Sequence, residues 1–301
     1  MITGIYEGGA SGLKIPVTRD AKSAVHPKSL RPRQSELGMT IIQSPHDTLS
    51  TDGYVFLRGA VAPAICQAFA EKVNEEYHRL HAAGWRFAES GGLAGHLNIR
   101  MGREGRALYD SFRAAGVEQL AQQLCGQPLH LAQAIDNLNL PGSCAQDFHI
   151  DGAFAAPLLI ANVCLVPTDA SNGATALVAG SHAAELSYWR FSRAGWRSRG
   201  VAPSANPGDV LLRWSNLWHR GMPNRTAKPR PMAAFTFAPG PAGDAARHCT
   251  DFDGPLTLFA NKYHGHFRKA KELLAVRLPL LDEGLRQARS LLVDHCQRGQ
   301  R

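Results

Sequence analysis

The sequence predicts a mainly β fold in which helices flank one antiparallel double-sheet barrel. Two observations lead to this class. Between about residues 128 and 240, short apolar runs alternate with Pro, Gly, Asn and Asp at a spacing typical of sandwiches and barrels rather than βαβ units. On both sides of this region, apolar residues recur every three to four positions, which is the pattern of amphipathic helices.

The elements before the barrel follow from local signals. An apolar run over residues 54–57, bounded by turn residues, predicts a short strand. Residues 63–83 have helical spacing, with proline at the first position and glycine just after the end. A second helix is expected over residues 106–124, ended by Gly126.

The barrel and the C-terminal region follow in the same way. The runs predicted as strands are 129–140, 148–154, 158–166, 174–178, 209–219 and 231–238. Helical spacing returns beyond residue 262. We therefore expect an extended N-terminal arm over residues 1–48 and a single domain over residues 49–301, with its core at about 128–240.

Composition indicates an ordinary soluble protein. The 301 residues are 44% hydrophobic and 19% charged, and no stretch is apolar enough for a membrane span. The N-terminus lacks the apolar segment of a secretory signal. The six cysteines form no CxxC pair and are interpreted as reduced thiols. We expect a cytoplasmic protein with no membrane partner.

The positive charge is local. The formal net charge is +8, and residues 186–230 hold nine basic residues against one acid, Asp209. This segment is either a solvated arginine-rich loop or an attractive surface for an anionic ligand, and Arg190–Arg199 slightly favours an anionic or carboxylate-bearing substrate. Nucleic acid is the weaker alternative, because no aromatic stacking motif is interleaved at 190–199.

One short motif has the composition of a metal site. His149 and Asp151 stand at i and i+2 in a predicted strand, so that period-2 alternation places both side chains on one face. An imidazole and a carboxylate at this separation can bind one metal ion. With a second imidazole from elsewhere in the chain, the set selects non-haem iron(II) with open positions.

Further motifs follow in a fixed order. The segments that accompany the His149–Asp151 pair are Asp52–Gly59, Asn172–His182, Pro207–Trp214, His219 and Asn224–Arg230. In this order, over roughly residues 49–240, the sequence resembles the phytanoyl-CoA dioxygenase-like family of iron(II)/2-oxoglutarate oxygenases. Ala179 departs from the family pattern, which usually has proline there.

The resemblance implies a fold and a site. The family fold is a double-stranded β-helix, a cupin-like jelly roll, which agrees with the strand pattern. His149, Asp151 and His219 match the iron ligands, and Arg230 matches the arginine that binds the distal carboxylate of 2-oxoglutarate. Arginine suits that role because its planar fork holds a carboxylate in two parallel hydrogen bonds. Arg225 is the local competitor and is expected in a solvated turn.

Three asparagines are candidate co-substrate contacts. Asn137 and Asn139 share one face of the predicted strand 129–140, and Asn162 lies on the next strand after the motif. Their alternative role is that of polar residues in the barrel wall whose hydrogen bonds are satisfied within the protein.

The predicted function is that of an iron(II)/2-oxoglutarate-dependent dioxygenase acting on a small molecule. Dioxygen would be the oxidant and hydroxylation of an unactivated carbon the expected outcome, in a natural-product or secondary-metabolite pathway. Two alternatives stay open: a nucleic-acid-modifying oxygenase, and a non-catalytic metal-binding jelly-roll module. The complete set of His149, Asp151, His219 and Arg230 argues against the second.

Overall fold

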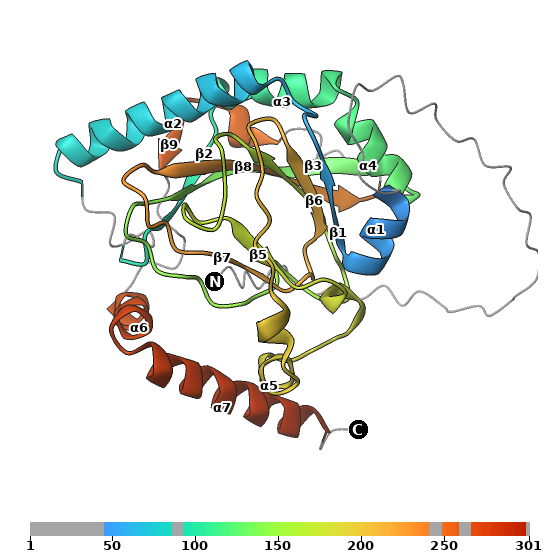
Figure 1. Ribbon diagram of the computed structural model, residues 1–301, viewed down its shortest axis with the longest axis vertical. Coiled ribbons are helices and arrows are strands. Elements are labelled where there is room, and N and C mark those ends of the chain that lie inside the picture. The colour runs from blue at the N-terminus through green and yellow to red at the C-terminus, as the bar shows by residue number, and fades with distance from the viewer. Residues whose placement is uncertain (1–44, 86–92, 241–248, 259–265, 299–301) are drawn as a thin grey trace, which may run out of the picture.

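Two antiparallel sheets form the centre of the structure (Figure 1). The computed structural model describes residues 45–85, 93–240, 249–258 and 266–298. The large sheet has the strand order β1-β6-β4-β8-β3-β2-β9. Its strands are β1 (Tyr54–Leu57), β2 (His96–Arg100), β3 (Leu129–Asn139), β4 (Leu159–Cys164), β6 (Val210–Trp214), β8 (Arg230–Pro239) and β9 (Thr257–Leu258). The small sheet pairs β5 (Thr175–Leu177) with β7 (His219–Gly221).

The chain winds between the two sheets in a regular way. From β4 to β8, successive strands alternate between the large and the small sheet. This alternation is the path of a double-stranded β-helix, so the predicted jelly-roll class is confirmed. The predicted strands at 54–57, 129–140, 158–166, 174–178 and 231–238 all lie where they were expected.

Helices cover the outer face of the large sheet and enclose the main core (Figure 1). The helices that precede β3 are α1 (Pro45–Asp52), α2 (Pro63–Ala82), α3 (Arg106–Ala114) and α4 (Val117–Cys125). Phe69 of α2 and Phe112 of α3 are buried in this core with Phe235 and Phe237 of β8. The ring centroids of Phe112 and Phe235 are 5.0 Å apart, a typical aromatic contact.

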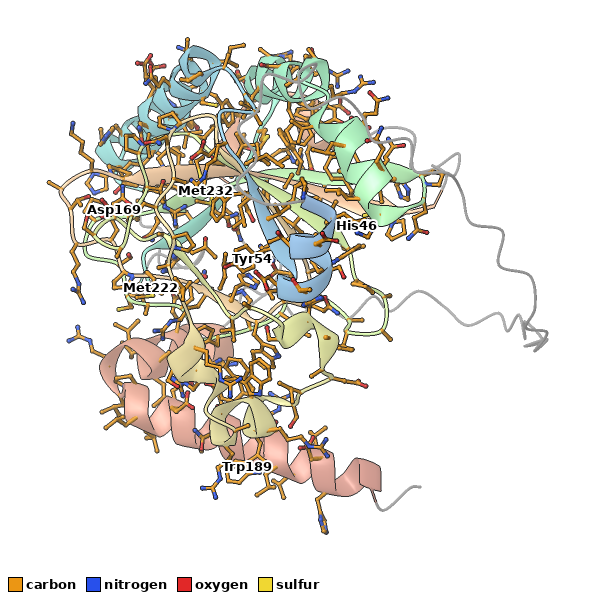
Figure 2. All side chains as sticks on the ribbon, turned by 45° about the vertical axis from the view of Figure 1, so that its right-hand side comes forward. His46, Tyr54, Asp169, Trp189, Met222 and Met232 are labelled. Carbon is orange, nitrogen blue, oxygen red and sulfur yellow. The ribbon has the colours of Figure 1, made fainter. Side chains whose placement is uncertain are left out.

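One helix from the barrel region and the two C-terminal helices lie on the other side of the barrel (Figure 1). They are α5 (Tyr188–Arg193), α6 (His266–Arg277) and α7 (Pro279–Arg298). Figure 2 shows Trp189 where α5 meets α7, and its backbone N–H donates to Ser290 Oγ over 3.0 Å. Ser187 of the α5 N-cap likewise donates to Asp294 of α7 over 2.6 Å, whereas Leu281, Leu285 and Leu292 are more than half exposed.

Three expectations about individual elements were wrong. The helix predicted over residues 106–124 is two helices, α3 and α4, because Gly116 adopts a left-handed φ of 72° between them. The run 209–219 is not one strand. It leaves the large sheet after Trp214 and turns, with Leu217 N–H donating to Trp214 O, before it joins the small sheet at His219.

The run 148–154 is not a strand either. Within it the structure has a single β-bridge, between His149 and His219, and the chain bends after Ile150. Residues 1–44 of the predicted arm lie outside the described residues, and residues 45–48 are part of α1. Among the helices that the structure describes, none has both the length and the apolar character needed to cross a membrane.

A fully buried carboxylate lies in the main sheet. Asp136 is fully buried on β3, and its register neighbours are the fully buried Ile99 of β2 and Ala233 of β8. Burial raises the pKa of Asp136 to about 7, although the charge of Arg230 opposes this shift. The folded protein therefore holds a proton on Asp136 in a pH range where the unfolded chain has lost it.

Asp136→Asn is expected to stabilise the protein at pH 8 and to change little near pH 4. The folded pKa is raised above the unfolded value, so the protonated carboxyl favours folding at low pH and this contribution is lost as the pH rises toward 7. The difference in the free energy of unfolding between variant and parent should grow to roughly 2–4 kcal/mol above pH 7. Urea titrations at pH 4.5 and pH 8 measure it. If the free energy of unfolding changes with pH in the same way in both proteins, the raised pKa of Asp136 is contradicted.

Candidate metal centre

Backbone pairing between two distant segments brings the metal-site motif together. His149 and His219 exchange both backbone hydrogen bonds, over 2.9 and 3.0 Å. This pairing places His149 beside His219, the first residue of β7. Their rings lie next to each other, with centroids 4.5 Å apart. Asp151 lies in the bend, where its backbone N–H donates to Ser215 O over 2.7 Å. The pairing, rather than strand alternation, aligns these side chains.

Neighbouring apolar residues anchor this arrangement from behind. Phe148 and Trp218, each one position from a candidate ligand, are buried in a second apolar cluster with Val178 and Phe191. The rings of Phe191 and Trp218 stack with centroids 4.1 Å apart. The packing fixes the backbone on the far side of His149 and His219 and leaves their imidazoles facing the barrel.

The three side chains converge on one point. One donor atom each from His149, Asp151 and His219 lies within 4.8 Å of the others, and this is the one such group of His, Cys or acidic residues in the part of the chain that the structure describes. Asp151 Oδ1 is 3.5 Å from His149 Nε2, and Asp151 Oδ2 is 3.2 Å from His219 Nε2. Two nitrogens and one carboxylate form the donor set that suits iron(II) with open positions.

The second nitrogen of each ring is bound to a carbonyl oxygen. His149 Nδ1 lies 2.7 Å from Asp147 O, and His219 Nδ1 lies 2.9 Å from Leu217 O. Because a carbonyl only accepts, each Nδ1 must carry a proton, and in the neutral ring Nε2 then keeps a free lone pair toward the centre. Carbonyl partners of this kind fix the orientation of metal-binding histidines.

The charge states also suit a cation. Burial lowers the pKa of His219 to about 4, so that its imidazole is neutral near pH 7. Burial alone would raise the pKa of Asp151, but His219 and Arg213 outweigh that effect and hold the pKa of Asp151 well below its usual range. The site therefore presents an ionised carboxylate and a neutral His219, so the residues fit a bound iron(II) ion.

Arg213 is a site residue that sequence analysis did not single out. It is 5% exposed on β6 and donates from Nη2 to Asp151 Oδ2 over 2.7 Å. It also donates from Nε to Asn162 Oδ1 over 3.0 Å. A charged residue within the apolar run 210–214 is the one signal that could have indicated it, but its partners cannot be read from the sequence.

Arg230 is enclosed at the start of β8. It is 4% exposed, and its Nη2 donates to Gly173 O over 2.6 Å, whereas its Nε has no partner among the described residues. Gly173 has a φ of 91°, and a Cβ there would collide with the Asn139 amide, so only glycine permits this approach. Arg225 is exposed, as expected for a turn residue.

The three asparagines have different surroundings. Asn139 is buried, donates to Met222 O over 2.9 Å and accepts from Ser143 Oγ. Asn162 accepts from Arg213. Asn137 is partly exposed on β3, in register with Asn98 of β2 and Met232 of β8. Asn139 and Asn162 are thus engaged within the protein, and Asn137 stays the candidate co-substrate contact.

The arginine-rich segment 190–199 forms ion pairs with α7. Arg190 lies 3.5 Å from Asp294, and Arg197 pairs with Glu283. The other two arginines of residues 190–199 stack on tryptophans of α5 and of the short helix Trp196–Arg199. On α7, Arg286 also binds the Asp147 carboxylate at 2.5 Å, so this helix is tied to the loop that carries His149.

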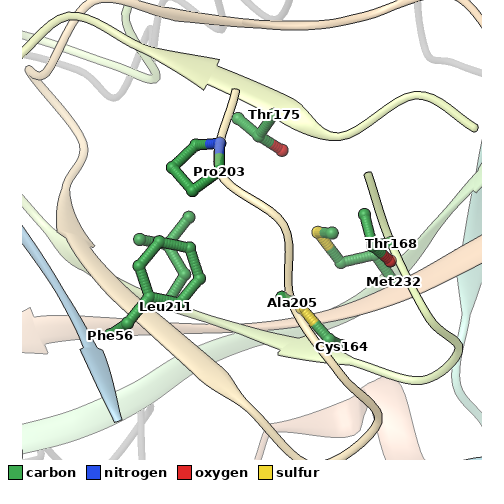
Figure 3. Close-up of a pocket in the computed structure, with 8 residues that line it drawn as sticks. All are labelled: Phe56, Cys164, Thr168, Thr175, Pro203, Ala205, Leu211 and Met232. Carbon is green, nitrogen blue, oxygen red and sulfur yellow. The ribbon is translucent and has the colours of Figure 1, made fainter. Parts of the chain in front are cut away.

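A small apolar cavity lies inside the barrel (Figure 3). It is lined by Phe56, Cys164, Thr168, Thr175, Pro203, Ala205, Leu211 and Met232. Its volume of about 10 Å³ is comparable to one water molecule. Met232 stands two residues after Arg230 on the same strand (Figure 2). The cavity is too small to hold 2-oxoglutarate.

Comparison with known proteins agrees with the fold. Residues 49–232 match the phytanoyl-CoA dioxygenase (PhyH) family. Among solved structures, AviO1 from Streptomyces viridochromogenes Tue57 matches with a TM-score of 0.54 and 18% identity, over 68% of this chain and 96% of that chain. The non-heme, alpha-ketoglutarate-dependent carbocyclase SnoK from nogalamycin biosynthesis matches with a TM-score of 0.54 and 17% identity, over 77% of this chain and 93% of that chain.

A third structure was solved with a ligand. EvdO2 from Micromonospora carbonacea var. aurantiaca, complexed with 2-oxoglutarate, gives a TM-score of 0.51 and 16% identity, over 72% of this chain and 99% of that chain. At these identities the structural likenesses establish the fold, and the family match confirms the resemblance that the ordered motifs predicted.

Proposed function

The chain belongs to the phytanoyl-CoA dioxygenase family of iron- and 2-oxoglutarate-dependent oxygenases, and on this premise we propose that it hydroxylates an unactivated carbon of a small molecule. The observation that carries the proposal is the convergence of His149, Asp151 and His219 on one point. The substrate class proposed is a natural-product intermediate. SnoK comes from nogalamycin biosynthesis, which supports this class.

The protein contributes binding and orientation. His149 and His219 would bind iron through Nε2 and Asp151 through its carboxylate. Iron(II), when bound, supplies the activation of dioxygen and the oxidative decarboxylation of 2-oxoglutarate. In sum, one C–H group, 2-oxoglutarate and O2 become one alcohol, succinate and CO2. The protein's own residues determine which substrate carbon lies next to the metal and which molecules bind beside it.

Arg230 would hold the co-substrate. Its unpartnered Nε and its guanidinium fork can bind the distal carboxylate of 2-oxoglutarate in charge-assisted hydrogen bonds. Because Arg230 is almost completely buried, such an ion pair forms away from water and is strong. The apolar cluster of Phe148, Phe191 and Trp218 keeps water away from the opposite side of the ligand residues.

The reaction outcome can be tested with isotopes. Asp151 fills the ligand position that would otherwise be free for chloride, so we expect the product to take up one oxygen atom from 18O2 and no chlorine. Mass spectrometry of the product, formed under 18O2 in high chloride, measures both. A chlorinated product from the unmodified enzyme would overturn the role of Asp151. A product with neither 18O nor chlorine would indicate desaturation or ring closure instead of hydroxylation.

A further inference from the structure

Arg213 is a buried cation inside the barrel, next to the proposed metal ligands. On β6 it is in register with Tyr54 of β1 and Ile160 of β4. The preceding residue, Leu212, belongs to the main core on the opposite face of the sheet. Strand alternation therefore directs Arg213 to the barrel interior, where water cannot solvate its charge.

Two polar partners fix the guanidinium group. Asp151 Oδ2 accepts from Nη2 over 2.7 Å, and Asn162 Oδ1 accepts from Nε over 3.0 Å. Asn162 is itself buried on β4, the strand next to β6. Because the guanidinium is planar, two hydrogen bonds from different nitrogens determine both its position and its tilt. Arg213 is thus a rigid support that reaches from the wall of the large sheet to Asp151.

The two carboxylate oxygens of Asp151 have different partners. Oδ2 accepts from Arg213 Nη2 and also lies 3.2 Å from His219 Nε2, whereas Oδ1 lies 3.5 Å from His149 Nε2 and accepts no bond from Arg213. We propose that Arg213 is a positioning residue which, braced by Asn162, restrains Asp151 so that one carboxylate oxygen is offered to the metal and the other stays in the hydrogen bond. The inference rests on the proposed function, because it assumes that Asp151 binds the metal.

Two effects of Arg213 on metal binding have opposite signs. Its positive charge repels a divalent cation, so removing the charge would tighten binding. Its hydrogen bond pre-orients Asp151, so removing the bond would weaken binding, and loss of such an outer partner costs about 10- to 100-fold in metal affinity. The proposal requires the second effect to be the larger, which makes the direction of the change decisive.

The experiment is a calorimetric titration of the metal-free protein with Mn²⁺, a redox-stable substitute for iron(II). Arg213→Met is expected to weaken Mn²⁺ binding by about 10- to 100-fold. Arg213→Lys, which retains the charge and one donor nitrogen, should recover part of the loss. The matched control is Arg58→Met, because Arg58 forms a comparable ion pair with Asp209 at 2.8 Å that is distinct from the ligand group. This control should bind Mn²⁺ as the parent does.

The outcomes separate the two proposals. If the parent protein binds no Mn²⁺ and no iron(II), the proposed function fails. If the parent binds Mn²⁺ and Arg213→Met binds equally or more tightly, only the positioning role fails, and an equal loss in Arg58→Met also overturns it. Should Arg213→Met not fold, Asn162→Ser provides the test, because it removes the brace and leaves Asp151 and Arg213 in place. It should weaken Mn²⁺ binding severalfold, and unchanged binding would refute the proposal.

Discussion

His219→Ala is expected to reduce 2-oxoglutarate turnover to less than about a thousandth of the parent value, a barrier increase of about 4 kcal/mol or more. The substitution removes one of the three donors that converge within 4.8 Å, and His149→Ala should have the same effect. The measurement is the succinate released from 2-oxoglutarate. His130→Ala is the control, because His130 bonds the backbone of Gly240 and is not part of the ligand group. Turnover near the parent rate in either ligand variant would contradict the assignment.

Asp151→Ala should differ from the histidine variants in one respect. It abolishes turnover but also leaves the buried Arg213 charge without its carboxylate partner. Breaking a buried pair from one side costs on the order of 3–5 kcal/mol of folding free energy. Asp151→Ala should therefore melt well below His219→Ala in the absence of metal, as thermal unfolding will show. Equal melting temperatures would mean that Arg213 does not depend on Asp151.

Arg230→Met is expected to weaken 2-oxoglutarate binding by about a hundredfold or more. Truncating one partner of a buried charge pair costs roughly 2–5 kcal/mol. Arg225→Met is the matched control, because Arg225 is exposed and an arginine in water contributes little to binding. Anaerobic calorimetry of the metal-loaded variants gives both dissociation constants.

Equal effects from the two arginines would show that Arg230 is not the carboxylate-binding residue. Arg230 also donates to Gly173 O, so the unfolding temperature of Arg230→Met must be measured beside the binding constant. Loss of 2-oxoglutarate affinity at an unchanged unfolding temperature identifies a binding role. Arg230→Lys keeps the charge without the fork and should fall between parent and Arg230→Met.

Local sequence signals predicted most of the barrel. Turn residues around short apolar runs placed β1, β3, β4, β5 and β8 correctly, because each of these strands is bounded by its own Gly, Pro, Asn or Asp residues. The errors have separate causes, and the helix predicted over residues 106–124 is divided by the left-handed Gly116. Residues 148–154 have the apolar character of a strand, but just one bridge forms there because the chain must bend to bring Asp151 to Ser215.

The site was predictable as far as it depends on motifs. His149, Asp151 and His219 were found from residue type and order, and the structure brings them together. Arg213 was not found, because its two partners are 51 and 62 residues away in sequence. The fully buried Asp136 was likewise missed, since only its register with Ile99 and Ala233 shows that it lies in the core. Such roles depend on tertiary pairing, which no local pattern encodes.

The metal centre is tested most directly by an anaerobic titration of the purified protein with iron(II) in the presence of 2-oxoglutarate, followed by visible absorption. One iron per chain should bind, and a weak charge-transfer band should appear when both components are present and disappear in His219→Ala. A protein that binds no iron, or develops no band when 2-oxoglutarate is added, would contradict the assignment of His149, Asp151 and His219 as a metal centre.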